Sequence, residues 1–152
     1  MGHSVDELSG ITKTLAYEFI DRLRMKGIEY QIRETYRPQI IQDAYYAQGR
    51  EPLEKVNDLR ARAGLYLLGA EEGKRIITKA KTSKHTERMA IDIVPVLSTG
   101  KIPWVVKDAT VAAIWLELGE LGESVGFEWG GRWTPLDAWG LGWDLPHYQV
   151  KI

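Results

Sequence analysis

The segment Ser83–Leu97 reads SKHTERMAIDIVPVL, and its second half predicts a strand because β-branched residues fill it. Asp92 lies inside this apolar strand, between two isoleucines. Burying an unpaired carboxylate costs several kcal/mol or forces its protonation, so Asp92 needs a positive partner. His85 lies just before the strand and could reach the same point.

Two interpretations of this segment are open at this stage. In the first, Asp92 forms a salt bridge with an arginine and His85 is an ordinary surface residue. In the second, His85 and Asp92 converge on one functional centre. The chain has only three histidines, so each of them carries unusual weight as evidence for the second interpretation.

Hydrophobic periodicity extends the prediction outward from this strand. Apolar residues at steps of three and four predict a first helix from Leu8 to Gly27, and strict alternation predicts a half-buried strand over 28–33. Further elements are a helix from Pro38 to Gln48, a charged helix or ordered insertion over 52–65, a short strand at Ile76–Ile77, a helix over Asp108–Leu118 and a strand over His147–Val150.

This order mixes helices and strands without regular βαβ repetition. It predicts an α+β fold with a small, mainly antiparallel sheet packed with about three helices. The 152 residues match one domain, and no internal repeat or linker divides them.

Composition excludes several classes of protein. The 20 basic and 21 acidic residues leave a net charge of −1, which argues against a nucleic-acid binder that neutralises many phosphates. The absence of cysteine excludes disulfides, iron–sulfur clusters, thiolate zinc sites and a cysteine nucleophile. Any metal site must therefore use His, Asp and Glu.

The chain shows no signal peptide at its start and no apolar run of the roughly 20 residues that a bilayer span needs. We therefore expect a protein that is made in the cytoplasm.

A second cluster, Trp143–Tyr148, reads WDLPHY. Together with His85 and Asp92, His147 completes a set of two histidines and one aspartate. Three such ligands suit a catalytic zinc ion, which keeps its fourth position open. Asp144 is then spare and is the candidate general base. His3, near the N-terminus, has no such context.

Three blocks of the sequence together resemble the zinc-dependent peptidoglycan peptidases. This family includes D-Ala-D-Ala carboxypeptidases and dipeptidases and the L-alanyl-D-glutamate endopeptidases of bacteriophage lysins. The matching residues are Ser83, His85, Ala90 and Asp92, then Gly126–Trp133 (GFEWGGRW), then Asp144–Tyr148 (DLPHY), with Thr35–Arg37 and Gln42 similar to the family's upstream T-x-R…Q element.

The resemblance implies one zinc ion per chain, held by His85, Asp92 and His147 with the site at the sheet face. It also implies that Asp144 is the catalytic base and that Arg37 contacts substrate and the developing oxyanion. Ser83, Trp129 and Tyr148 are expected to support the site or line the substrate cleft. Where the family commonly has glycine, three residues after the first histidine, this chain has Arg88, which puts the local loop geometry in question.

The tryptophans admit two interpretations, a stacking platform for glycan or stem peptide and ordinary core packing. We expect Trp129 and Trp143 to be largely structural supports of the metal loop. Trp104 and Trp115 follow the apolar pattern around the helix at 108–118 and are predicted to lie in the core.

A competing motif is Gly122–Gly126, which reads GESVG and fits the nucleophile elbow of serine hydrolases. That elbow needs a strand before it and a helix after it, whereas here a helical pattern precedes it. We therefore expect a helix end, with Ser124 playing no chemical part.

The resemblance implies a single catalytic domain over residues 1–152, without a separate wall-binding domain, that hydrolyses the L-alanyl-D-glutamate bond of peptidoglycan stem peptides. A phage or prophage lysin that acts on the cell wall after release is the expected role, as a monomer without a nucleic-acid partner. Two alternatives stay open: a D-Ala-D-Ala carboxypeptidase or dipeptidase of the same fold, and a non-catalytic, zinc-containing wall-binding module.

Overall fold

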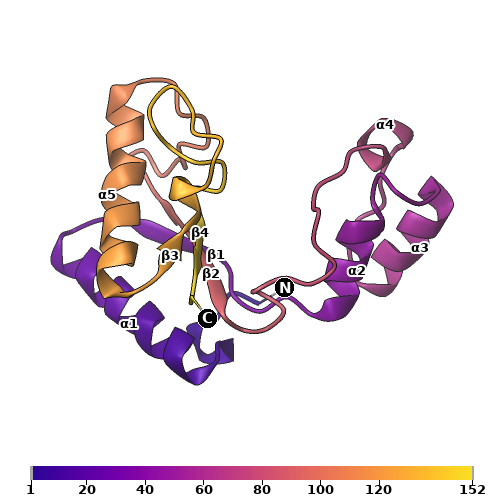
Figure 1. Cartoon of the computed structure of the whole chain (residues 1–152), viewed down its shortest axis with the longest axis horizontal. Helices are drawn as coiled ribbons and strands as arrows, with labels where there is room; N and C mark the ends of the chain where they lie inside the picture. The colour runs from indigo at the N-terminus through magenta and orange to yellow at the C-terminus, as the bar shows by residue number, and fades with distance from the viewer. Residues whose placement is uncertain (1, 152) are drawn as a thin grey trace.

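The computed structural model describes residues 2–151 and has an α+β architecture (Figure 1). The helices and strands are α1 (Gly10–Met25), β1 (Tyr30–Glu34), α2 (Gln39–Ala47), α3 (Leu53–Arg62), α4 (Ala70–Gly73), β2 (Ala90–Pro95), α5 (Ala109–Val125), β3 (Glu128–Trp129) and β4 (His147–Gln149), with 3-10 turns η1 (Val5–Glu7) and η2 (Gly130–Arg132).

The four strands form one antiparallel sheet in the order β1-β2-β4-β3. The predicted fold class is therefore confirmed. β2, the strand inferred from Met89–Leu97, lies between β1 and β4. Because β4 comes from the last residues of the chain, the sheet places the two predicted motifs on neighbouring strands.

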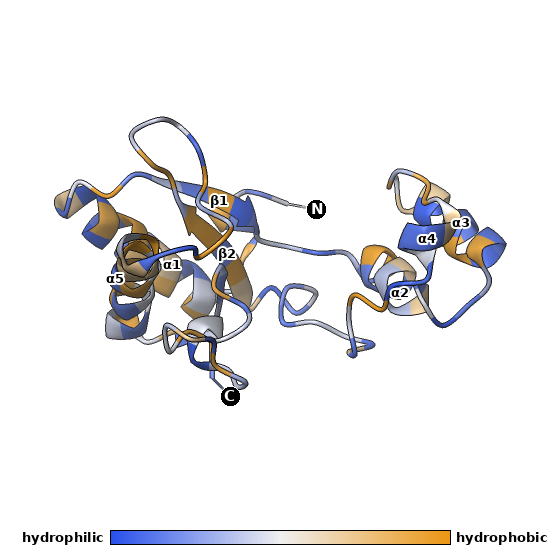
Figure 2. Ribbon diagram, turned by 90° about the horizontal axis from the view of Figure 1, so that it is seen from above, coloured by the Kyte–Doolittle hydropathy of each residue, from blue (hydrophilic) through white to orange (hydrophobic). Residues whose placement is uncertain are grey.

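Helices α1 and α5 pack on the sheet and enclose the main core. Large residues fully buried there include Phe19 and Leu23 from α1 and Trp115 and Leu118 from α5. Ile91 and Ile93 of β2 face the same core, and the β2 ribbon is hydrophobic (Figure 2). Since side chains alternate along a strand, Asp92 must project to the opposite face of the sheet.

Helices α2, α3 and α4 form a lobe that stands apart from the sheet in Figure 1. The lobe has a small core of its own around Ala47, Val56 and Leu68. The charged segment over 52–65 is thus a helix, and α4 is an element that the periodicity did not predict. Ile76 and Ile77 follow the lobe in extended, exposed chain without strand pairing, so the strand expected there is wrong.

The sequence predicted the start of α5 better than its end. Asp108 caps its N-terminus by accepting a hydrogen bond from Val111 N at 2.9 Å. The helix continues seven residues beyond the predicted end, Leu118, to Val125, and ends where Gly126 adopts a φ of +118°.

Candidate metal centre

His85 lies in a turn that immediately precedes β2. Ser83 shapes this turn, because its hydroxyl accepts a hydrogen bond from His85 N at 3.1 Å and its carbonyl accepts one from Thr86 N at 3.0 Å. The His85 side chain is 2% exposed. Ser83 thus holds the backbone of the turn that carries His85.

The sheet register brings the second and third predicted ligands together. Asp92 on β2 is the direct cross-strand partner of His147 on β4. Residues opposite each other on antiparallel strands carry their side chains on the same face within reach of contact. The two side chains therefore meet although 55 residues separate them in the sequence.

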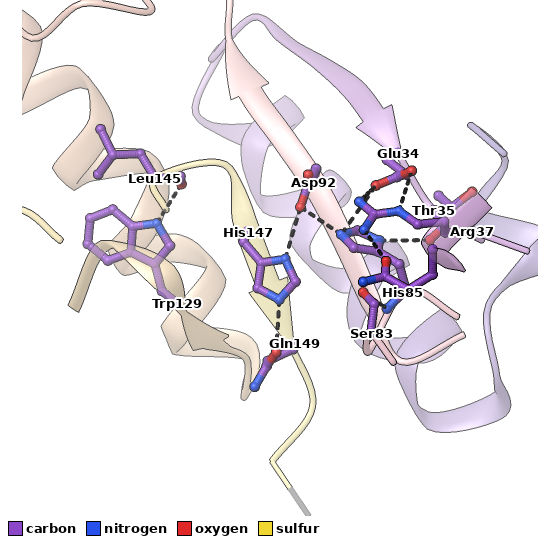
Figure 3. Close-up of polar contacts among 11 residues, drawn as sticks. Glu34, Thr35, Arg37, Ser83, His85, Asp92, Trp129, Leu145, His147 and Gln149 are labelled. Carbon is purple, nitrogen blue, oxygen red and sulfur yellow. Dashed lines mark hydrogen bonds and ion pairs between the residues drawn. The ribbon is translucent and has the colours of Figure 1, made fainter. Parts of the chain in front are cut away.

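The three predicted ligands converge on the Asp92 carboxylate (Figure 3). Asp92 Oδ1 lies 3.0 Å from His85 Nε2 and 3.1 Å from His147 Nδ1. One ligand atom from each residue falls within 4.8 Å of the other two. Among residues 2–151 this is the set of His, Asp and Glu side chains grouped closely enough to hold a metal ion.

The outer nitrogen of each histidine faces an acceptor. His85 Nδ1 lies 2.9 Å from the carbonyl oxygen of Thr35, and His147 Nε2 lies 2.8 Å from Gln149 Oε1. A carbonyl oxygen only accepts, so His85 Nδ1 carries a hydrogen and, in the neutral ring, Nε2 carries the lone pair. In the neutral ring the inward nitrogen and the carboxylate are two facing bases. A proton between them forms a hydrogen bond, and a metal cation in its place would be bound by both.

The charges of the site match this arrangement. Burial by itself raises the pKa of Asp92, but the hydrogen bonds with His147 and His85 outweigh it and hold the pKa of this carboxyl well below its usual range. Burial opposes the charged form of His147, yet the hydrogen bond with Asp92 and the Asp92 charge raise its pKa above the ordinary value. The carboxylate is thus ionised and its nearest neighbours are two imidazoles, the donor set that a divalent cation needs.

Asp144 lies close to this set without belonging to it. Burial raises its pKa, and the nearby Asp92 charge raises it further against the opposing effects of His147, His85 and Arg37. A half-buried carboxylate with a raised pKa is a stronger base than a solvated one. Asp144 is therefore a partly buried carboxylate beside the three side chains that could hold a metal ion.

The block Gly126–Trp133 holds the Asp144 loop in place. Gly130 O accepts a hydrogen bond from Asp144 N at 3.3 Å, and a Cβ added to Gly130 would lie 2.2 Å from the Asp144 carbonyl oxygen. Only glycine permits this approach of the two backbones. Trp129 supports the same loop, since its indole donates to Leu145 O at 2.8 Å (Figure 3).

Arg37 is bound within the protein. Its guanidinium donates to both carboxylate oxygens of Glu34 and, through Nη1, to Gln42 Oε1 at 2.8 Å. The Glu34 carboxylate also lies 3.7 Å from His85 Nε2. Arg37 is therefore linked to the metal centre through Glu34, a buried residue that the sequence analysis did not single out.

The expectation that Tyr148 lines the substrate cleft is wrong. Its side chain is fully buried and packs on the core face against Phe19 and Trp129, because it alternates with His147 along β4. Trp129 is also buried, so it supports the centre and does not line a cleft.

The tryptophans outside this block divide differently from the prediction. Trp115 is buried as expected, but Trp104 is 53% exposed and lies against Arg33, so its assignment to the core is wrong. Trp143 is 64% exposed and is not a buried support. It contacts Trp133, whose ring lies 5.3 Å from the His147 ring, so an aromatic surface adjoins the metal centre.

Ser124 has no nucleophile environment. It lies in the last turn of α5, where its hydroxyl contacts the Leu121 carbonyl at 2.6 Å and Arg22 Nη1 at 2.8 Å. Neither a preceding strand nor a neighbouring histidine is present there, as the pattern of the sequence indicated.

The sequence analysis did not identify Glu34, the Thr35 carbonyl or Gln149 as neighbours of the candidate ligands. A backbone carbonyl carries no sequence signal, because any residue provides one. Gln149 had a usable signal, since it stands two residues after a candidate ligand on the same strand face.

Comparison with known proteins agrees with the geometry. Residues 77–150, which contain all three candidate ligands and Asp144, match the family described as D-alanyl-D-alanine carboxypeptidase. The chain is 30% identical over 128 residues to the peptidoglycan L-alanyl-D-glutamate endopeptidase CwlK of Bacillus subtilis (strain 168). This alignment covers 82% of the chain but 62% of CwlK, so the chain spans less than two thirds of that relative.

Two solved structures share the fold. The L-Ala D-Glu endopeptidase ChiX of Serratia marcescens superposes with a TM-score of 0.57 at 16% identity, over 97% of this chain and 83% of ChiX. The LD-carboxypeptidase LdcB superposes with a TM-score of 0.53 at 11% identity, over 94% of this chain and 58% of LdcB.

In the described residues, the longest helices are too short or too polar to cross a bilayer.

Proposed function

We propose that the chain is a zinc-dependent peptidase of peptidoglycan stem peptides, because residues 77–150 match the family described as D-alanyl-D-alanine carboxypeptidase. The observation that carries the proposal is the convergence of His85, Asp92 and His147, with Asp144 beside them and outside the ligand set. A structural site uses all its protein ligands to close the coordination sphere, whereas three ligands leave a position for chemistry.

The donor set favours zinc among the available metals. Two imidazole nitrogens and one carboxylate oxygen are typical zinc ligands, and the buried, mixed N/O set suits magnesium and calcium poorly because those ions prefer oxygen. Zinc bound there would act as a Lewis acid that polarises the scissile carbonyl and makes water more acidic. We propose one ion per chain.

The remaining steps belong to the side chains around the ligands. Asp144 accepts a proton from the attacking water at its carboxylate and passes it to the leaving amine. Arg37, fixed by Glu34 and Gln42, presents positive charge toward the site and stabilises the developing oxyanion. Because both groups are held before substrate arrives, little reorganisation accompanies the reaction.

We propose the L-alanyl-D-glutamate bond as the bond that is cleaved. CwlK, to which the chain is similar, is named a peptidoglycan L-alanyl-D-glutamate endopeptidase, and this supports the choice. The family description supports a second candidate, cleavage of a terminal D-Ala-D-Ala bond. The two differ in what they release: the first separates the stem peptide from L-alanine on the glycan, and the second frees D-alanine.

Mass spectrometry of fragments released from purified peptidoglycan tests both candidates. Stem peptides that begin at D-glutamate are expected, from protein loaded with zinc. Free D-alanine without such peptides would establish the second candidate instead. The matched pair Asp144→Asn and Asp58→Asn controls for contaminants, because Asp58 is an exposed aspartate on α3, paired with Arg62 and remote in sequence from every ligand.

The role as a phage or prophage lysin stays a prediction with its own test. Purified protein added to permeabilised Gram-negative cells should lower their turbidity, and Asp144→Asn should not. Unchanged turbidity with active wild-type protein would remove the lysin role while leaving the peptidase activity in place.

A further inference from the structure

A chain of hydrogen bonds extends from His147 away from the metal centre. His147 Nε2 lies 2.8 Å from Gln149 Oε1, and Gln149 Nε2 donates to Glu128 Oε2 at 3.2 Å. The other Glu128 oxygen accepts a hydrogen bond from the Trp133 indole at 3.3 Å. Figure 3 shows the first of these contacts, with Gln149 on the opposite side of the His147 ring from Asp92.

The sheet positions His147, Gln149 and Glu128. Glu128 on β3 is the direct cross-strand partner of Gln149 on β4, and Gln149 lies two residues from His147 on the same face. The Trp133 ring also packs against the His147 ring, with 5.3 Å between their centroids. Directly opposed strand positions thus hold the contacts in one geometry.

The direction of these hydrogen bonds, from donor to acceptor, follows from Glu128, where they end. An ionised carboxylate only accepts hydrogen bonds, so Glu128 requires donors from both Trp133 and Gln149. The Gln149 amide must then point its NH₂ group toward Glu128, which turns its oxygen toward His147. An amide oxygen accepts, so His147 Nε2 carries a hydrogen and, in the neutral ring, Nδ1 carries the lone pair that faces Asp92.

We propose that Gln149 and Glu128 are positioning residues that select the Nε2–H tautomer of His147 and thereby set the metal affinity of the centre. The inference rests on the proposed metal site and deepens it. The two histidines reach the same state by different means: for His85 a backbone carbonyl fixes the tautomer, whereas for His147 two side chains fix it. Only the His147 arrangement can therefore be altered by mutation without changing a ligand.

Metal affinity measured without substrate tests the proposal. Zinc binding is measured by competition with a chromophoric chelator. Gln149→Leu removes the acceptor and should weaken zinc binding by roughly 10- to 100-fold, the usual cost of losing a partner that orients a metal-bound histidine. Gln31→Leu is the matched control, since Gln31 is an exposed glutamine on β1, and its affinity should equal that of the wild type.

Exchanging the residues at positions 149 and 128 separates an effect on the His147 tautomer from an effect on packing. Gln149→Glu alone opposes two carboxylates across the strands and should weaken binding. The double variant Gln149→Glu with Glu128→Gln keeps every contact but exchanges the amide and the carboxylate. The carboxylate at position 149 still accepts a hydrogen bond from His147. The amide at position 128 donates to that carboxylate and accepts from Trp133. Affinity in the double variant should return to within about threefold of wild type, because the neutral-ring tautomer is again imposed.

Nitrogen-15 NMR of the zinc-loaded protein provides a direct readout. The His147 ring should show a protonated Nε2 in the wild type and in the double variant. Wild-type affinity in both Gln149→Leu and Gln149→Glu, or a protonated Nδ1 in the loaded wild type, would overturn the proposal. If instead His147→Ala binds zinc as tightly as the wild type, the metal site itself is wrong, so the two failures are distinguishable.

Discussion

Arg88 has a backbone φ of +62°, in the left-handed region that glycine adopts without cost. It stands where the resemblance expected glycine, so the geometry that glycine would provide is kept by a residue with a side chain. Two contacts of that side chain accompany the strained backbone: Nη1 donates to Glu7 O at 2.9 Å, and the guanidinium lies 3.8 Å from the Tyr36 ring. The turn that carries His85 is thereby tied to the N-terminal segment.

Two substitutions at this position separate the strain from the contacts. Arg88→Ala loses the contacts and keeps the strain, whereas Arg88→Gly loses the contacts and relieves the strain. Glycine should therefore give the more stable protein by about 1 kcal/mol, opposite to its effect at ordinary positions. Urea denaturation measures the difference, and an alanine variant as stable as the glycine variant would show that Arg88 is unstrained.

Asp144 provides the test of the proposed base. Asp144→Asn keeps the size of the side chain and removes its basicity, so the cleavage rate should fall by roughly 10²- to 10⁴-fold with zinc content unchanged. Cleavage assays and elemental analysis of the same preparation measure both quantities. Loss of zinc would make Asp144 a ligand, and full activity would place the base elsewhere.

Arg37 has both a chemical and a structural consequence. Arg37→Ala leaves the Glu34 carboxylate, 6% exposed at its side chain, without its cation. We expect a loss of about 3 kcal/mol in unfolding free energy, since removing one member of a buried pair leaves an uncompensated charge. The cleavage rate of the folded fraction should fall by roughly 10²- to 10³-fold.

Arg37→Lys distinguishes the two contributions. A lysine keeps the charge near Glu34 but cannot reproduce the planar fork that contacts Glu34 and Gln42 together. Most of the stability should return while most of the rate does not. Wild-type rates in Arg37→Lys would show that a point charge suffices, and unchanged stability in Arg37→Ala would show that Glu34 needs no partner.

At the scale of elements, the centre depends on how closely two loops approach. The Gly-Gly turn after β3 contacts the loop that leads into β4, and Gly130 is the point of contact with Asp144. Trp129 also holds the loop before β4, because its indole donates a hydrogen bond to Leu145 O. Asp144 is thus placed by backbone packing between segments.

Gly130→Ala tests this packing. A methyl group 2.2 Å from the Asp144 carbonyl oxygen forces the loops apart, so activity should fall at least tenfold and stability by about 1 to 3 kcal/mol. The control is Gly10→Ala in the first turn of α1, where an added Cβ meets nothing within 4 Å. Cleavage assays and thermal melts measure both variants; a Gly130→Ala protein equal to Gly10→Ala would show that the loops yield freely.

At the scale of the whole molecule, the three candidate ligands come from the turn before β2 and from two strands of the sheet. The unfolded chain has no preformed site, so a bound metal stabilises the native state by mass action. The lobe α2–α4 has its own small core and contains none of the ligands. Metal binding should therefore stabilise the sheet region directly.

Removal of the metal measures this coupling. With free zinc at 100 times its dissociation constant the gain is about 2.7 kcal/mol, which corresponds to roughly 5 to 10 °C in Tm for a chain of this length. Calorimetry with and without a chelator should show this shift in the wild type and in His3→Ala. His147→Ala should show little or none, and an equal shift there would contradict the assigned ligands.

The sequence by itself determined the parts of this protein that depend on local order. Hydrophobic periodicity indicated α1 and α5, Pro38 indicated the start of α2, and alternation and β-branched content indicated β1 and β2. The candidate ligands were recognisable because a buried aspartate and two of only three histidines stood in short motifs. Each of these signals lies within about a dozen residues, where spacing has a direct geometric meaning.

Tertiary structure alone decided what faces what. The register of β2, β4 and β3 places His147 opposite Asp92, Glu128 opposite Gln149, and Tyr148 in the core. The chain folds Glu34 and the Thr35 carbonyl against His85 from 50 residues away. It leaves Trp104 exposed although the apolar pattern predicted a core position, and it leaves Trp143 exposed although a structural support was expected there. Contacts between distant segments depend on how whole elements pack, because burial belongs to the assembled sheet and helices and not to any single stretch of sequence.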